Sequence, residues 1–79
     1  MKTPKRPPKL TISNTIRPLR FQHSEMTQQE LADRIGVSRQ TVNAIETGKY
    51  SPSLDVAFRI AMVFQKRVEE VFPCEIATK

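Results

Sequence analysis

The 79-residue sequence predicts an all-α fold, a compact domain of five short helices within residues 14–72. Three observations predict it. Helix start signals recur along the chain, apolar residues between them fall at intervals of three and four, and glycine or proline ends three of the runs, at Gly36, Gly48 and Pro73. A chain of this length buries only about 60% of its unfolded surface, so we expect one domain with a modest core.

The segment before this domain, residues 1–13, is expected to form a flexible arm because it is rich in proline and poor in apolar residues. Its four cations are Lys2, Lys5, Arg6 and Lys9. They supply most of the net charge of +5 and leave the rest of the chain at +1. Residues 10–13 alternate apolar and polar side chains, which also allows a very short strand that pairs across a dimer axis.

The first helix is expected at about residues 15–23, capped by Ser13 or Asn14. With Asn14 as the cap, Pro18 falls at the fourth helical position and removes an early hydrogen bond. We therefore expect a tightened or kinked first turn, or a later start. His23 lies at the end of this helix, isolated from a second ligand, and is expected to face solvent.

The strongest signals lie in residues 26–48. Thr27 and Glu30 have the spacing of a capping box, and Met26 and Leu31 hold the positions of a hydrophobic staple around it. These features predict a helix that begins directly after Thr27.

A second helix follows almost at once. Ser38 is its expected N-cap, and Val37 and Val42 hold the two staple positions. Gly36 and Gly48 would end the two helices, because glycine adopts the left-handed conformation without a Cβ clash. Only three residues separate the helices, so they must cross steeply, as in a helix-turn-helix.

The outward side of the second of these helices indicates a function. Val42 and Ile45 would pack inward, and the outward residues are Arg39, Gln40, Asn43, Ala44 and Thr47. Forked and amide hydrogen-bonding groups around one small apolar residue suit the major groove of double-stranded DNA. Taken alone, each of these residues is better explained as an ordinary polar residue on the surface. The short turn, the paired caps and this face together favour DNA binding.

The remaining helices would complete the core. Ser53 would cap a helix over residues 54–64 that is apolar nearly all round and should be buried on most sides, with some apolar surface left for a partner subunit. A short helix at about residues 68–72 would end at Pro73, and residues 73–79 would form a C-terminal tail.

Composition argues against catalysis and against a membrane protein. One histidine and one cysteine, Cys74, leave no set of residues for a zinc cluster, a disulfide framework or a His-assisted nucleophile. We expect no enzyme activity, no cofactor and no bound metal. The sequence has no long apolar run and no signal peptide, so a cytoplasmic protein without membrane contact is expected.

Residues 27–32, 36–42, 45–46 and 48–54 together resemble the xenobiotic-response-element family, which includes the phage Cro and repressor proteins. The resemblance covers about residues 14–72 and implies a lambda-repressor-like five-helix fold. Gln65 and Lys66 depart from the family pattern, which usually has glycine and an apolar residue there, and Arg67 replaces a small helix cap. These departures leave the geometry of the last helix open.

The resemblance also implies roles for single residues. Those that face base edges would be Arg39, Gln40, Asn43 and Ala44. Those beside the DNA backbone would be Thr27, Gln28, Thr41, Lys49 and Tyr50. Gln28 would hold a phosphate at the start of its helix, where free N–H groups attract anions. Arg20 and Glu46 would form a partly buried structural pair.

We therefore expect a sequence-specific transcriptional regulator, a repressor that binds an inverted-repeat operator as a homodimer, with half-sites about 34 Å apart. The arm would contact phosphates or a minor groove, or would only aid solubility, and we weight the two equally. The alternative function is an antitoxin or adaptor whose main partner is another protein. An apolar patch on the last two helices that only a different chain fills would favour it.

Overall fold

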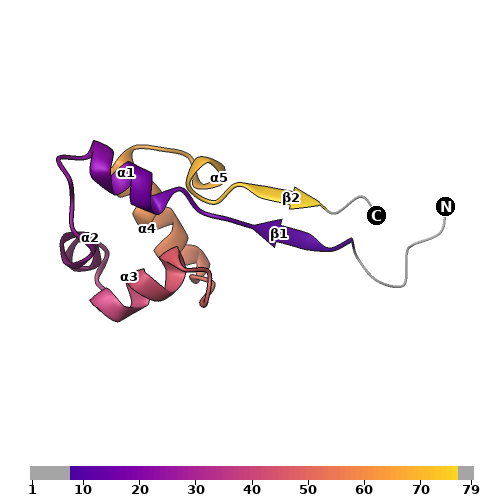
Figure 1. Cartoon of the computed structure of the whole chain (residues 1–79), viewed down its shortest axis with the longest axis horizontal. Coiled ribbons are helices and arrows are strands. Elements are labelled where there is room, and N and C mark those ends of the chain that lie inside the picture. The colour runs from indigo at the N-terminus through magenta and orange to yellow at the C-terminus, as the bar shows by residue number, and fades with distance from the viewer. Residues whose placement is uncertain (1–7, 77–79) are drawn as a thin grey trace.

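The computed structural model describes residues 8–76, which form a helical body and a small antiparallel sheet (Figure 1). Its elements are β1 (Leu10–Ile12), α1 (Ile16–Gln22), α2 (Gln28–Ile35), α3 (Arg39–Glu46), α4 (Leu54–Phe64), α5 (Val68–Val71) and β2 (Cys74–Ile76). The five helices are those expected from the sequence. The all-α expectation is not strictly correct, because β1 and β2 pair with each other.

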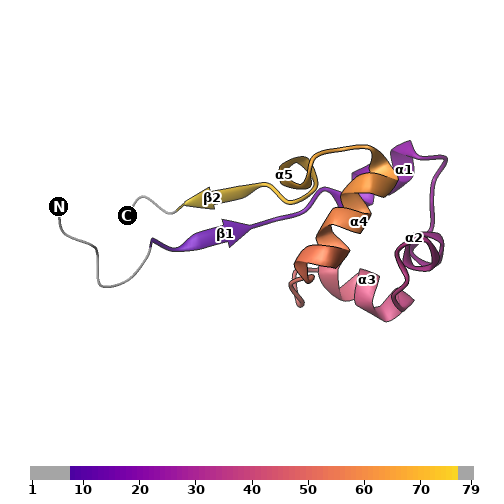
Figure 2. The same cartoon turned by 180° about the vertical axis from the view of Figure 1, so that it is seen from behind.

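The two strands form a ribbon that projects from one end of the body (Figures 1 and 2). Residues 10–12 of the expected arm thus pair with residues 74–76 of the expected C-terminal tail. The strand predicted at residues 10–13 is present, but its partner is in the same chain and not across a dimer axis. The ladder forms because the entry to α1 lies beside the exit from α5: Ser13 N donates to Pro73 O at 2.9 Å, and Thr15 N donates to Val71 O at 2.9 Å. Lys2, Lys5 and Arg6 lie outside the described residues.

Helix α1 starts late enough to accommodate its proline. Thr15 is the N-cap and Ile16 the first helical residue, so Pro18 is the third. The first four N–H groups of a helix, counted from the cap, have no intrahelical acceptor, so Pro18 removes no bond. The prediction for His23 was wrong: this side chain is half-buried, with its ring edge-on to Phe64 at a centroid distance of 5.1 Å.

The caps of the central helices follow the predicted pattern. Thr27 Oγ1 accepts from Glu30 N at 3.0 Å, and Glu30 Oε1 accepts from Thr27 N at 2.8 Å, which completes the capping box. Ser38 Oγ accepts from Thr41 N at 3.1 Å. Gly36 ends α2 with φ of +77°. Each side-chain cap contributes about 1 kcal/mol to helix stability, so the boundaries of α2 and α3 are set locally.

The core is made by all five helices. Its largest fully buried side chains are Phe64, Ile16, Leu31, Ile35, Ile60, Val42 and Val71. Helix α4 crosses the body and is seen in front in the reverse view (Figure 2). The expectation that α4 is buried on most sides was wrong, because Leu54, Phe58 and Met62 form an outward stripe with 72%, 52% and 75% of their surface exposed.

Helix α5 forms at the expected position although Gln65, Lys66 and Arg67 depart from the family pattern. Gln65 ends α4 in the left-handed conformation, with φ of +56°, at the position where the resemblance leads us to expect glycine. Lys66 N then donates to Ala61 O at 2.9 Å, as at a glycine-terminated helix. Arg67 contributes its backbone, whose N–H donates to Glu70 Oε1 at 2.8 Å.

An ion pair between α1 and α3 fixes the position of the second motif helix. Arg20 Nε lies 2.6 Å from Glu46 Oε2, and Arg20 Nη2 lies 3.1 Å from Glu46 Oε1. Both side chains are more than nine-tenths buried. Arg20 Nη1 also donates to Met26 O at 2.7 Å, just before α2 begins. The guanidinium group therefore joins α1, the α1–α2 connection and the end of α3.

The conformation of Gln65 generates a prediction about stability. Gln65→Gly should raise the free energy of unfolding by about 1 kcal/mol, because the left-handed conformation is strained for residues with a Cβ. The matched control is Gln29→Gly in the first turn of α2, which should lower it. Urea denaturation measures both. Equal losses in the two variants would contradict the assigned strain.

The burial of the Arg20–Glu46 pair generates a second prediction. Glu46→Ala should cost about 3–5 kcal/mol, because it leaves a buried guanidinium without its carboxylate. Asp55→Ala is the control, since it breaks an exposed pair with Arg59 on α4 and should cost at most about 1 kcal/mol. Chemical denaturation of the two variants tests this, and similar costs would show that the buried pair is not structurally important.

Candidate nucleic-acid interface

The interface is built on α2, α3 and the three residues between them. The chain reverses after α2 because Gly36 N and Val37 N both donate to Ala32 O, at 2.9 Å and 3.1 Å. Val42 and Ile45 on the inner side of α3 are 1% and 2% exposed. Their burial determines which side of α3 faces outward.

The outer side of α3 carries the residues that the sequence singles out for base contacts. Arg39, Gln40 and Asn43 are exposed, and Ala44 lies half-buried among them. Thr47 is also exposed, but its hydroxyl group donates to Asn43 O at 2.9 Å. Four different side chains are thus brought together on one surface, while the Thr47 hydroxyl group serves the end of the helix.

The loop after α3 folds back beside this surface. Lys49 N and Tyr50 N both donate to Ala44 O, at 2.9 Å and 3.2 Å, after a turn in which Gly48 has φ of +77°. An open depression of about 250 Å³ lies between this loop and α3. It is lined by Ser38, Gln40, Thr41, Ala44 and Tyr50. Its lining combines hydroxyl and amide groups with the methyl groups of Thr41 and Ala44, so the depression can accept polar and apolar atoms side by side.

Gln28 connects α2 to α3. Its side-chain Nε2 donates to Asn43 Oδ1 at 3.1 Å and to Glu46 Oε1 at 3.3 Å. Because Asn43 Oδ1 is held in this way, its NH₂ group is directed away from Gln28 and can donate to a ligand. The order of the side chains on α3 therefore depends on a residue of α2.

Asn14 is a residue whose role the sequence did not reveal. Its Nδ2 donates to Ile45 O and Glu46 O, both at 3.2 Å, and its Oδ1 accepts from Ile16 N at 3.1 Å. The expectation that Ser13 or Asn14 is the N-cap of α1 was wrong, because Thr15 holds that position, and Asn14 instead satisfies carbonyl groups at the end of α3. It is 31 residues away from Ile45, and no local pattern could have paired them.

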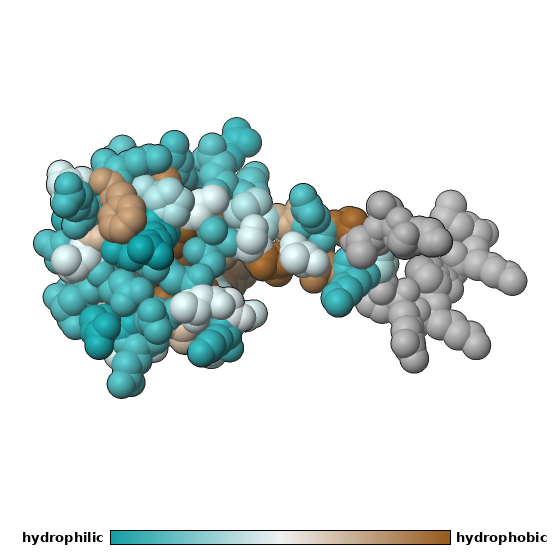
Figure 3. Space-filling view, viewed as in Figure 1, coloured by the Kyte–Doolittle hydropathy of each residue, from teal (hydrophilic) through white to brown (hydrophobic). Residues whose placement is uncertain are grey.

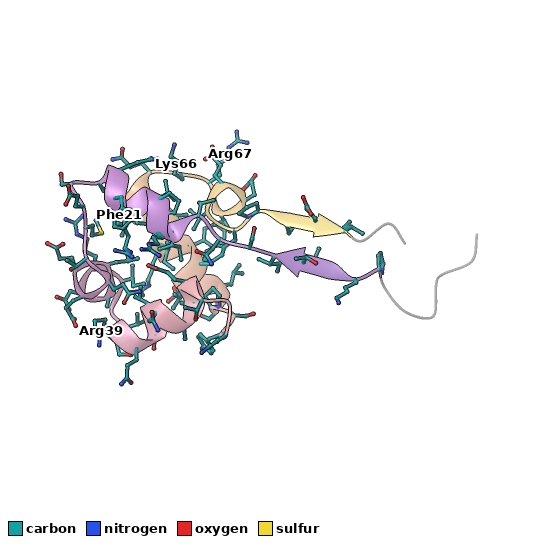
Figure 4. The ribbon with its side chains drawn as sticks, viewed as in Figure 1. Phe21, Arg39, Lys66 and Arg67 are labelled. Atoms are coloured by element: carbon teal, nitrogen blue, oxygen red, sulfur yellow. The ribbon has the colours of Figure 1, made fainter. Side chains whose placement is uncertain are left out.

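The cations beside the expected interface are few. Arg39 lies on the side of the body formed by α2 and α3, and Lys66 and Arg67 lie on the opposite side (Figure 4). Lys49 is exposed in the loop after α3, and Lys9 is exposed just before β1. Any electrostatic attraction at the α3 surface therefore starts from a small number of placed charges.

Within residues 8–76, no group of three histidine, cysteine or acidic side chains could hold a metal ion. None of the helices described there is long and apolar enough to cross a membrane.

Comparisons with known proteins agree with this geometry. A helix-turn-helix family model matches residues 21–71. An uncharacterized HTH-type transcriptional regulator of Methanocaldococcus jannaschii is 48% identical over 61 residues, which are 77% of this chain and 91% of that relative. A regulator of Bacillus subtilis with the same description is 41% identical over the same shares of each chain.

A further relative, an uncharacterized HTH-type transcriptional regulator of Archaeoglobus fulgidus, is 53% identical over 47 residues, which are 60% of this chain and 66% of that relative. Each of these relatives thus matches 60% or more of this chain. The chain belongs to the Cro/repressor-type helix-turn-helix family of DNA-binding transcriptional regulators.

Proposed function

We propose that this protein regulates transcription by binding a specific sequence of double-stranded DNA, with α3 in the major groove. The observation that carries the proposal is the outer surface of α3, where Arg39, Gln40 and Asn43 are exposed around the half-buried Ala44. A groove of B-DNA admits one helix, and these side chains match the donors, acceptors and thymine methyl groups on base edges.

Each of these side chains has a defined chemical role in the proposal. Arg39 offers a planar fork that can bind O6 and N7 of a guanine. Asn43 accepts from Gln28 through Oδ1, so its NH₂ group is available to donate to a base acceptor. Gln40 and Ala44 line the depression beside α3, where a thymine methyl group would contact Ala44 and a base edge would reach the amide.

The DNA backbone would be held at both ends of this surface. The capping box of α2 uses the N–H groups of Thr27 and Glu30, and the two N–H groups between them, those of Gln28 and Gln29, remain for a phosphate. Thr27 and Gln28 are therefore proposed to lie beside one strand. At the other end, Thr41, Lys49 and Tyr50 would contact phosphates and set the register of α3 without reading sequence.

We further propose a homodimer that represses by occupying an inverted-repeat operator. One eight-residue helix reads few base pairs, whereas two copies related by a two-fold axis double the contacts. Half-sites would then lie about 34 Å apart on one face of the duplex. A small domain on the operator is sufficient to exclude a polymerase sterically, so repression requires no further activity from this chain.

A second candidate function is that of an adaptor or antitoxin bound to a different protein. The exposed stripe of Leu54, Phe58 and Met62 on α4 favours it, because these apolar side chains are available to a partner. DNA binding would then be secondary. Selection of bound sequences from a random duplex pool, with the stoichiometry of the complex measured alongside, separates the two functions: the regulator alone strongly enriches one inverted repeat, whereas an adaptor with secondary DNA binding enriches no sequence strongly without its protein partner.

The proposed role of Arg39 predicts a loss of specificity. Arg39→Ala should weaken binding to the selected sequence by about 1–3 kcal/mol and relax the preference at one base position, while binding to random DNA changes much less. Arg67→Ala on the opposite side of the body is the control and should alter neither. Equal losses on selected and random duplexes would show that Arg39 contacts phosphate instead of a base.

The proposed contact of the arm predicts a change in salt dependence. Deletion of residues 1–9 removes Lys2, Lys5, Arg6 and Lys9 but keeps all residues of both strands. If all four neutralise phosphates, the slope of log K against log salt should become shallower by about 3.6, from about 0.9 for each cation. Titrations at several salt concentrations measure the slope. An unchanged slope would return the arm to a solubilising role.

A further inference from the structure

The ribbon has one apolar face and one polar face. Side chains directly opposite each other in an antiparallel pair lie on the same face, and alternate residues of a strand share a face. Leu10 pairs with Ile76 and Ile12 with Cys74, so these four side chains share one face. The remaining pair, Thr11 and Glu75, lies on the other face.

This apolar face is exposed in the single chain. Leu10, Ile12 and Ile76 have 53%, 59% and 59% of their surface accessible, and brown atoms mark the ribbon where it leaves the body (Figure 3). An isolated two-stranded ribbon is at best marginally stable in water and needs a further apolar surface against it. The ribbon therefore lacks the packing that such a pair of strands requires.

The apolar face continues onto the body. A cavity of about 210 Å³ lies at the base of the ribbon. It is lined by Ile12, Ser51, Pro52, Leu54, Ala57 and Phe72. Leu54 is also the first residue of the exposed stripe of α4, which continues at intervals of four to Phe58 and Met62. The ribbon face, the cavity and the stripe form one surface, which we name the ribbon–α4 surface.

We propose that the ribbon–α4 surface is the self-association surface of this protein and that the same surface of a second copy occupies it. The inference rests on the homodimer in the proposed function and assigns its interface. A two-fold contact needs a surface that fits itself. Here a projecting ribbon and a recess at its base lie on one chain, so each copy can offer both parts of the contact.

The apolar area is close to what a stable dimer needs. Six large apolar side chains of this surface are each 52–75% exposed. Complete burial of a fully exposed side chain of this kind removes on the order of 100 Å² from water. Because these six are about 60% exposed on average, they supply roughly 400 Å² per copy. A standard interface buries about 800 Å² per partner, of which about 56–65% is apolar. The six side chains therefore supply most of the apolar part.

The ribbon–α4 surface leaves the reading surface free. Arg39, Gln40 and Asn43 lie on the outer side of α3, whereas the cavity is bounded by Ile12 and Leu54. A second cavity joins the two regions, because Ile12 and Tyr50 both line it. A dimer axis at the ribbon would therefore lie near the loop after α3, and each copy could still present its α3 to DNA.

Sedimentation of the full chain tests the proposal with a matched pair of lysines. The wild type should sediment as a dimer at micromolar concentration. Leu10→Lys puts a charge on the apolar face and should raise the dimer dissociation constant at least about tenfold. Thr11→Lys puts the same charge on the polar face opposite Glu75 and should leave it unchanged.

A second variant separates dimer loss from ribbon unfolding. Phe58→Lys lies on α4, outside the ribbon, at a position that is already 52% exposed, so helix content by circular dichroism should stay constant while dimerisation weakens. A wild type that is monomeric at all concentrations would overturn the proposal. Dimerisation that is equal in Leu10→Lys, Phe58→Lys and Thr11→Lys would overturn it too.

A half-site duplex distinguishes the interface from the function. Leu10→Lys should bind one selected half-site as well as the wild type does, and should lose only the extra affinity for the inverted repeat. Failure of the wild-type dimer to bind any duplex would refute the DNA-binding function and leave the assigned interface standing. Retention by Leu10→Lys of full affinity for the inverted repeat would refute the interface alone.

Discussion

The orientation of α3 depends on one buried contact, the paired hydrogen bonds between the Arg20 guanidinium and the Glu46 carboxylate. A buried charge of either sign is costly unless its partner is in place, so the pair tolerates only one relative position of α1 and α3. Met26 O accepts a third bond from the same guanidinium and fixes the start of α2. The two motif helices are therefore placed by a side chain that lies outside both of them.

Because of this arrangement, most side chains on the outer side of α3 are not needed to hold the helix in place. Its inner side is committed to the core through Val42 and Ile45, and its end is held by Asn14 and Glu46. Side chains on the outer side can then vary without loss of the fold, as specificity between related regulators requires. Asn43 and Thr47 are the exceptions, because Asn43 accepts a hydrogen bond from Gln28 on α2 and the Thr47 hydroxyl group donates to Asn43 O.

Local signals account for what the sequence predicted well. Thr27, Glu30 and Ser38 cap their helices through atoms at most three residues away, so their spacing was sufficient to place α2 and α3. Features that depend on distant residues could not be predicted from local patterns, and the Arg20–Glu46 pair was expected only from the family resemblance. The β1–β2 ladder joins segments more than 60 residues apart, and the contact of Asn14 with α3 joins atoms that no periodic pattern relates.

The exposure of the α4 stripe belongs with these failures, because a count of apolar residues in a helix does not reveal how many neighbouring helices surround it. The candidate base contacts were predicted from the sequence and lie together on α3. One experiment tests directly whether these residues bind DNA. That test is a titration of the ¹⁵N-labelled protein with its selected duplex, followed by amide chemical shifts. If the outer side of α3 binds the duplex, the largest shifts fall in residues 27–29 and 38–50; largest shifts in α4 and α5, with α3 unperturbed, would contradict this role.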